Sequence, residues 1–211
     1  MRHFLLFFAF MLCLSATCAY GQTVVSSTLS AGDLRDGDLL FAVNEEGNAI
    51  TASTSSGRDL PIDHVGIFFR DGGKSCVVEA SARRGVAVTD LAAFLADNHL
   101  CVVGRVDSLL ADASVSNALR YRGLPYDSLF EADDSAMYCS ELVQKSFVDS
   151  LGHHVFTTIP MSFHDSTGTV LPFWTDFYRR HGRTVPEGEP GTNPGQLARS
   201  PKTKIIGWMK G

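Results

Sequence analysis

The stretch Tyr138-Cys139-Ser140-Glu141-Leu142-Val143 decides how the sequence is interpreted, because it places a thiol at the start of a predicted helix. Ser135 is a candidate N-cap just ahead of it. Apolar residues then recur every four positions from Cys139 to Phe147, which puts them on one face of an amphipathic helix. We therefore expect the Cys139 side chain to face the interior, within the first turns of this helix.

A thiol at a helix N-terminus has chemical consequences. The first N–H groups of a helix lack partners, and the helix dipole adds about half a positive charge there, so thiolate is favoured over thiol. Reactive cysteines are often found at such positions. The alternative is that Cys139 is a small buried hydrophobic residue, as free cysteines frequently are.

A candidate base lies upstream, in a predicted β-hairpin. Residues 63–70 and 75–80 both have the composition of strands, and an Asp-Gly pair between them is typical of a type I′ turn. With Asp71 and Gly72 as the central turn residues, Arg70 lies opposite Gly73. Counting back along the ladder places His64 opposite Glu79.

Glu79 opposite His64 could fix the imidazole tautomer and stabilise the imidazolium. A slip of one residue would instead bring Ala80 opposite His64, so the prediction depends on the turn. The alternative is a surface histidine and glutamate at a strand end. Together with Cys139, the two residues would form a nucleophile, a base and a group that orients the base.

Five short motifs between Asp36 and Lys145 carry a family resemblance. In order they are Gly37-Asp38-Leu39-Leu40-Phe41, His64-Val65-Gly66-Ile67, Glu79-Ala80, Pro125-Tyr126-Asp127 and Tyr138-Cys139-Ser140-Glu141-Leu142-Val143. The sequence resembles the permuted papain-like cysteine hydrolases of the YiiX type, relatives of the NlpC cell-wall peptidases. The resemblance implies an α+β, circularly permuted papain-like fold, with a small antiparallel sheet packed against the helix that bears the nucleophile.

The resemblance also implies roles for particular residues. Cys139 would be the nucleophile, His64 the base and Glu79 the third member. Tyr126 would lie near the cleft, where its hydroxyl could donate to an oxyanion alongside the Cys139 N–H. Tyr138 is a second candidate for substrate or oxyanion contact. A packing aromatic remains the alternative for Tyr126.

The composition of the chain limits the number of domains and the classes of partner that it can have. The chain has 211 residues, 45% of them hydrophobic and 19% charged, which suits one globular domain over residues 22–211. The net charge of −5 argues against nucleic-acid binding. No Cys-x-x-Cys pair or glycine-rich phosphate loop is present, so we expect neither a metal nor a cofactor.

The N-terminus has the pattern of an export signal. A short basic start precedes an apolar run from Phe4 to Leu14, which is too short to span a bilayer, and small residues follow. We expect residues 1–21 to be a signal peptide and the mature protein to be periplasmic or extracellular. A buried N-terminal helix and lipidation at Cys18 are the alternatives.

Three cysteines remain after the signal, and an odd count in an exported protein indicates one free thiol. Cys76 and Cys101 lie in apolar, strand-like runs. They could form a disulfide, or both could be buried thiols. In the predicted ladder Cys76 points away from His64, which makes it a poor candidate nucleophile.

Other parts of the chain have weaker patterns. Short strands or helices are expected at residues 38–43, 89–96, 100–106, 114–121, 173–180 and 204–208. Residues 44–60 and 185–201 are expected to be long irregular segments, and the shape of the cleft is expected to depend on the loops at 44–60 and 183–201. For residues 44–60, a plain mobile loop is the preferred interpretation.

The predicted chemistry is attack of Cys139 on a carbonyl to form a thioacyl enzyme, followed by hydrolysis. The resemblance favours an amide substrate, either cell-wall peptide or an acylated small molecule. Acyl transfer or thioester cleavage on lipids by the same three residues is an alternative. A cell-wall-binding domain without catalysis is another, although a pure binder needs none of the three residues.

Overall fold

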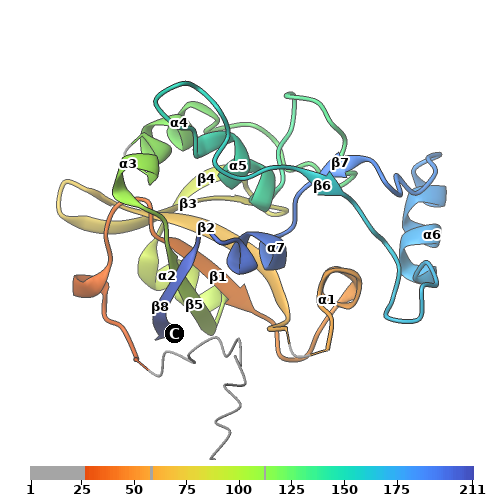
Figure 1. Ribbon diagram of the computed structural model, residues 1–211, viewed down its shortest axis with the longest axis horizontal. Helices are drawn as coiled ribbons and strands as arrows, with labels where there is room; N and C mark the ends of the chain where they lie inside the picture. The colour runs from red at the N-terminus through yellow and green to blue at the C-terminus, as the bar shows by residue number, and fades with distance from the viewer. Residues whose placement is uncertain (1–26, 58, 112) are drawn as a thin grey trace, which may run out of the picture.

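A computed structural model describes residues 27–57, 59–111 and 113–211 (Figure 1). Its centre is a six-stranded sheet in the order β4-β3-β2-β1-β5-β8, in which neighbouring strands are antiparallel. Its strands are β1 (Leu39–Val43), β2 (Ile62–Asp71), β3 (Lys74–Ser81), β4 (Gly85–Asp90), β5 (Leu100–Arg105) and β8 (Lys204–Lys210). The predicted signal, residues 1–21, lies outside the described residues.

Helices cover both faces of this sheet. They are η1 (Ala31–Asp33), α1 (Ala49–Thr54), α2 (Leu91–Asp97), α3 (Ser108–Ala111), α4 (Ser114–Arg120), α5 (Cys139–Ser146), α6 (Pro172–Arg180) and α7 (Pro194–Arg199). A second, two-stranded sheet pairs β6 (Ile159–Pro160) with β7 (Pro190–Gly191). No helix among the described residues is long and apolar enough to cross a membrane.

Alternation along the strands divides the core between the two faces. On β2, Val65 and Ile67 belong to the large cluster that also contains Cys139 and Leu142 of α5. Phe68 points to the opposite face, into the cluster formed with α2. Because side chains alternate across a strand, each face of β2 buries its own row of apolar residues. The expected packing of the sheet against the cysteine-bearing helix is therefore confirmed.

A third, smaller apolar cluster lies to one side of the sheet, around α6 (Figure 1). Phe163, Trp174 and Tyr178 are its buried members. Ile50 of α1 and Phe130 of the loop before α5 pack against them. This cluster joins segments that are far apart in the sequence, and we call it the side cluster.

Most of the predicted elements are present, but several segments differ. The expected loop at 44–60 contains α1, and the expected loop at 185–201 contains β7 and α7. Strand β4 was not predicted, because a helix was expected at residues 89–96, with Thr89 or Asp90 as its cap. In the structure Thr89 belongs to β4, and Asp90 stands at the N-cap position of α2.

The predicted register of the β2–β3 hairpin is wrong by two residues. Asp71 pairs with Lys74, so the central turn residues are Gly72 and Gly73, and Glu79 lies opposite Gly66. Both turn glycines have positive φ, 54° and 88°. A type I′ turn requires positive φ at both central positions, and glycine adopts it without a Cβ clash, so Gly-Gly is preferred over Asp-Gly here.

A bulge in β2 lies next to His64. Ala42 of β1 pairs with His64, but Val43 pairs with Ile62, so Asp63 is an extra residue in β2. Bulges re-aim neighbouring side chains and are common beside active sites. Asp63 and His64 therefore lie at this irregularity, near the first residue of β2.

Candidate active site

Cys139 is the first residue of α5, with Tyr138 as the N-cap residue. The helix thus begins later than the predicted cap at Ser135, and the thiol lies directly at its N-terminus. The Glu141 carboxylate accepts a hydrogen bond from the Tyr138 N–H at 3.5 Å and contacts Lys145 Nζ at 2.9 Å. The side chain of Cys139 is buried, with 4% of the residue exposed, yet it lines a cavity.

His64 and Glu79 are in direct contact. The Nε2–H of His64 donates to Glu79 Oε2 at 2.7 Å, and the side chains are 17% and 4% exposed. A register error of two residues preserves the face of a strand, so the predicted contact exists, but it is diagonal across the ladder. With Nε2 engaged by Glu79, Nδ1 is the ring nitrogen left for the Cys139 thiol, and the interaction with Cys139 raises the pKa of His64.

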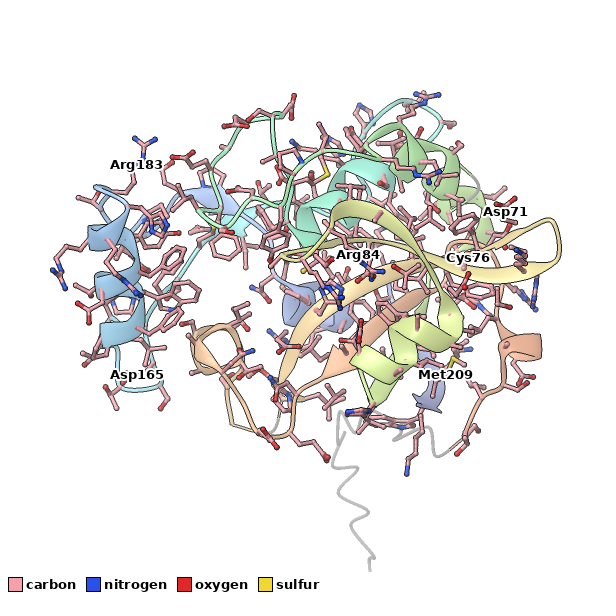
Figure 2. All side chains as sticks on the ribbon, turned by 180° about the vertical axis from the view of Figure 1, so that it is seen from behind. Asp71, Cys76, Arg84, Asp165, Arg183 and Met209 are labelled. Atoms are coloured by element: carbon pink, nitrogen blue, oxygen red, sulfur yellow. The ribbon has the colours of Figure 1, made fainter. Side chains whose placement is uncertain are left out.

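Two further side chains hold Glu79 in place. Arg84 Nη2 donates to Glu79 Oε1 at 2.8 Å, and Thr89 Oγ1 donates to the same oxygen at 2.6 Å. Arg84 belongs to the turn between β3 and β4, well separated from Cys76 near the hairpin end of β3 (Figure 2). Both carboxylate oxygens are therefore engaged, and the one facing His64 has a fixed position.

The ionisation of His64 and Glu79 follows from these contacts. Burial lowers the pKa of His64, but its hydrogen bonds and charge interactions with Cys139 and Glu79 outweigh burial and raise the pKa to about 10. Burial raises the pKa of Glu79, but His64, Thr89 and Arg84 together bring it below its usual value. These directions favour an imidazolium beside an ionised carboxylate at neutral pH.

The two candidate tyrosines have different surroundings. Burial, followed by the negative charge of Cys139, raises the pKa of Tyr126, so its phenol stays protonated. The hydroxyl of Tyr138 accepts a hydrogen bond from the Thr192 N–H at 3.1 Å. The ring of Tyr138 packs edge-on against Phe130, with centroids 5.2 Å apart. Both tyrosines line the cavity at Cys139.

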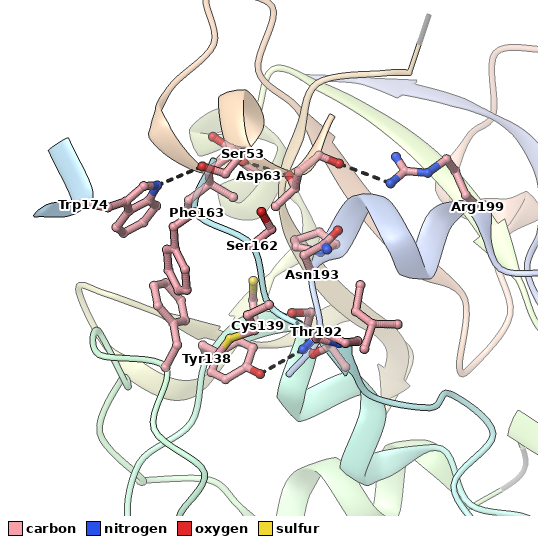
Figure 3. A pocket seen from close by; sticks show the side chains of 18 of the residues that line it. Ser53, Asp63, Tyr138, Cys139, Ser162, Phe163, Trp174, Thr192, Asn193 and Arg199 are labelled. Carbon is pink, nitrogen blue, oxygen red and sulfur yellow. Dashed lines mark hydrogen bonds between the residues drawn. The ribbon is translucent and has the colours of Figure 1, made fainter. Parts of the chain in front are cut away.

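The cavity beside Cys139 has a volume of about 230 Å³. Figure 3 shows the thiol pointing into it, with Tyr138 and Thr192 near the base of the helix and Trp174 on the far wall. Segments expected as loops supply much of the lining, through Ser53 of α1 and Thr192 after β7. The prediction that these segments shape the cleft is confirmed.

Asp63 is a residue of this region that sequence reasoning missed. Its Oδ2 accepts hydrogen bonds from Asn44 Nδ2 at 2.8 Å and from Asn48 Nδ2 at 2.6 Å. Arg84 and Thr89 were also missed as partners of Glu79. Recognising β4 would have placed Thr89 on the Glu79 face of the sheet, because Thr89 pairs with Val77.

The other cysteines do not approach the site. Cys76 and Cys101 are buried free thiols, so the possible disulfide is not formed. Burial raises the pKa of both, that of Cys101 to about 12, which makes them poor nucleophiles at neutral pH. Within the described part of the chain, no group of three or more His, Cys, Asp or Glu residues could hold a metal ion.

A cysteine at a helix start, together with a histidine that is hydrogen-bonded to a buried carboxylate, is typical of papain-like cysteine hydrolases. The order His64, Glu79, Cys139 along the chain is that of a permuted member. Comparison with known families agrees, since residues 33–207 match the permuted papain-like amidase enzymes described as YaeF/YiiX, C92 family. The chain belongs to this family.

Two relatives come from Escherichia coli. The chain is 25% identical over 189 residues to the uncharacterized protein YiiX of strain K12, covering 87% of this chain and 91% of the relative. It is also similar to a crystal structure titled metalloprotein yiiX from strain O157:H7, with 25% identity and a TM-score of 0.66. That match covers 82% of this chain and 96% of the solved chain.

Proposed function

We propose that this protein is an exported cysteine amidase with Cys139 as nucleophile, His64 as base and Glu79 as the residue that orients His64. The observation that carries the proposal is the His64 ring, which donates from Nε2 to Glu79 at 2.7 Å and whose pKa is raised by its interactions with both Glu79 and Cys139. A binding domain without catalysis would have no use for a buried carboxylate held by three partners. The amidase description of the family supports the same reaction class.

The reaction begins with a thiolate on Cys139 and a proton on His64. The sulfur attacks the amide carbonyl, a C–S bond forms, and the carbonyl π electrons move to oxygen. The Cys139 N–H at the start of α5 and the Tyr126 phenol are the proposed donors to this oxyanion. When the intermediate collapses, the C–N bond breaks and His64 gives its proton to the departing amine.

Hydrolysis of the thioacyl enzyme restores the starting state. Water attacks the thioester carbonyl while His64 takes one of its protons. Collapse then breaks the C–S bond, which releases the carboxylic acid and returns the thiolate beside a protonated His64. Glu79 stays ionised throughout and stabilises each imidazolium state, because a carboxylate at 2.7 Å interacts more favourably with a cation than with a neutral ring.

Intact-mass trapping tests the proposal. The wild-type protein is incubated with a panel of acyl amides, thioesters and cell-wall peptides, and quenched with acid. We expect an added acyl mass that peptide mapping places on Cys139. A Cys139→Ala variant should show no adduct, while Cys76→Ala should behave as wild type. An adduct on another residue would refute the assignment of the nucleophile.

A further inference from the structure

A charged hollow lies at the edge of the sheet where β1 and β8 begin and β5 ends. It has a volume of about 630 Å³, and its lining comes from the segment before β1, the end of β5 and the start of β8. From here β5 leads into α3, which lies on the opposite side of the molecule from α6 in Figure 1. Of the described residues that line this hollow, none lines the cavity beside Cys139. The charged hollow is therefore separate from the proposed active site.

Four cationic side chains line the charged hollow: Arg35, Arg105, Lys202 and Lys204. Two of them, Arg105 and Lys204, are directly opposite each other in the β5–β8 ladder. Like charges at opposed positions destabilise a sheet, because the Cβ atoms of such residues are only about 4.5–5.5 Å apart. An anion bound between these two side chains would relieve the repulsion.

Asp38 fixes the position of Arg105. The guanidinium of Arg105 donates from Nε to Asp38 Oδ1 at 2.7 Å and from Nη2 to Asp38 Oδ2 at 2.6 Å. Asp38 is 2% exposed, whereas the Arg105 side chain is 24% exposed. Within the described part of the chain, Nη1 of Arg105 has no hydrogen-bond partner. Arg105 therefore reaches the hollow already oriented, with one donor nitrogen available to a ligand.

The motif Gly37 to Phe41 gains a role from this contact, since Asp38 is its charged residue and the proposed reaction does not use it.

The other three cations have no such partner. The side chains of Arg35, Lys202 and Lys204 are exposed, and no side chain of residues 27–57, 59–111 or 113–211 forms an ion pair or a hydrogen bond with them. Arg35 comes from the segment before β1, and the two lysines come from the start of β8 and the residues just before it. Segments far apart in the sequence thus bring uncompensated positive charge to one place.

Two exposed carboxylates also line the charged hollow. Asp36 Oδ1 accepts a backbone N–H at 2.9 Å, and Asp107 Oδ1 accepts another at 3.0 Å. Because Arg105 neutralises Asp38, three cations remain beside these two carboxylates. The hollow therefore has an excess of positive charge, in a chain whose net charge is −5.

A phosphate group matches this arrangement. At neutral pH a phosphomonoester has a charge of about −1.5 to −2 and three strong acceptor oxygens. An oriented guanidinium and two ammonium groups can bind these oxygens together, whereas a carboxylate offers fewer acceptors and less charge. We infer that the charged hollow binds a phosphomonoester, with its phosphate held by Arg105, Lys202 and Lys204.

Calorimetric titration with glycerol 3-phosphate at low ionic strength tests the inference. The double variant Lys202→Gln/Lys204→Gln should bind it about tenfold more weakly than wild type, because charge-assisted hydrogen bonds to the phosphate are lost. Acetate should bind more weakly than glycerol 3-phosphate to the wild type. Equal affinities of the wild type for the two anions would overturn the assignment to phosphate.

A matched control separates this site from the general charge of the protein. Lys74→Gln/Lys210→Gln changes the net charge by the same amount at two exposed positions that do not line the hollow. This control should bind glycerol 3-phosphate as tightly as wild type. An equal loss of affinity in both double variants would overturn the inference.

Vesicles distinguish a free phosphomonoester from the headgroup of a lipid. Each protein is sedimented with phosphatidylcholine vesicles that contain or lack phosphatidic acid. Binding of glycerol 3-phosphate without sedimentation supports a free ester as the ligand. Sedimentation that requires phosphatidic acid, and that Lys202→Gln/Lys204→Gln loses while the control variant keeps it, supports a lipid headgroup. Binding to neither probe would overturn the inference, and the amidase proposal would be unaffected.

Discussion

Glu79 is a buried charge whose burial is compensated by hydrogen bonds and which holds His64 in position. An unpaired carboxylate with 3% exposure would be strongly destabilising. Here Arg84, Thr89 and His64 donate to its two oxygens. The cost of burying the charge is offset by these contacts, and the contact with His64 fixes the ring that faces Cys139.

Glu79→Gln tests the role of that charge at a nearly constant shape. Glu79 raises the pKa of His64, so the amide should lower it and the imidazolium should be lost at lower pH. We expect reduced kcat and an alkaline limb of the pH–rate profile displaced toward neutrality. Arg83→Gln, at an exposed neighbouring position, is the control. A profile identical to wild type would contradict an orienting role.

The same linkage predicts how stability depends on pH. The folded-state pKa of His64 is raised above its ordinary value of 6.5 to about 10. The stabilisation from protonating His64 is therefore fully present below pH 6.5 and is lost as the pH rises through 10. In urea unfolding from pH 6 to pH 9, wild type should lose more stability than His64→Gln. If the free energies of unfolding of wild type and His64→Gln change equally with pH, this linkage is ruled out.

Tyr126 and Tyr138 can be compared through the same substitution, from tyrosine to phenylalanine. Tyr126→Phe removes a proposed oxyanion donor and should lower kcat about a hundredfold. Tyr138→Phe removes the acceptor of the Thr192 N–H, so its main effect should be a lower melting temperature. Its loss of kcat should be smaller than that of Tyr126→Phe. Steady-state kinetics and thermal unfolding of both variants check this. Equal kcat values for Tyr126→Phe and wild type would remove Tyr126 from the oxyanion site.

At the scale of elements, the β2–β3 hairpin shows what the sequence can and cannot specify. The period of two along a strand predicted the face of Glu79 correctly, although the turn was placed one residue early, at Asp71-Gly72, which shifts the pairing by two residues. Local propensity does not distinguish Asp-Gly from Gly-Gly when the two are adjacent. The bulge at Asp63 escaped prediction because it depends on pairing with β1, which lies earlier in the chain.

Gly66 of β2 packs closely against Val77 of β3 and Phe94 of α2, and this packing supports the His64 ring. A Cβ at this position would lie 2.4 Å from Val77 Cγ1 and 3.1 Å from Phe94 Cε2. The Phe94 ring in turn packs beside the His64 ring, with centroids 5.9 Å apart. A side chain at Gly66 must therefore displace Val77 and press on the Phe94 ring, which packs beside the proposed base.

Gly66→Ala should accordingly cost about 1–3 kcal/mol of stability, the usual range for overpacking. It should also reduce kcat, because the displaced ring supports His64. Gly32→Ala is the control, since a Cβ there meets only Ser30 Oγ at 3.5 Å. Chemical denaturation and kinetics measure both effects. A Gly66→Ala protein as stable as Gly32→Ala would show that the neighbours yield freely.

At the scale of the whole molecule, the sheet and the side cluster contribute different parts of the site. The sheet and α5 hold the three proposed catalytic residues, and the motifs that identify them are local enough to be recognised from the sequence. In the helix expected at residues 173–180, Phe173 is exposed, whereas Trp174 is buried in the side cluster. Its second contribution, as a wall of the cavity, depends on contacts with α1 more than a hundred residues earlier.

Export is a further proposal at this scale, motivated by the apolar run from Phe4 to Leu14. Sequencing the N-terminus of protein isolated from its native host should find a mature form that begins near Tyr20 or Gln22. Protein isolated with Met1 to Leu14 still attached would contradict the proposal.

The most direct test of the account is the pH dependence of Cys139 alkylation by iodoacetamide, followed by peptide mapping. An ordinary thiol loses reactivity below its pKa of about 8.5, roughly tenfold per pH unit. Because His64 can hold a proton beside the sulfur, we predict that Cys139 is alkylated before Cys76 and Cys101 and still reacts readily at pH 6. His64→Ala should abolish this reactivity at low pH. Earlier labelling of Cys76 or Cys101, or a Cys139 profile that parallels a free thiol, would contradict the assignment of the nucleophile.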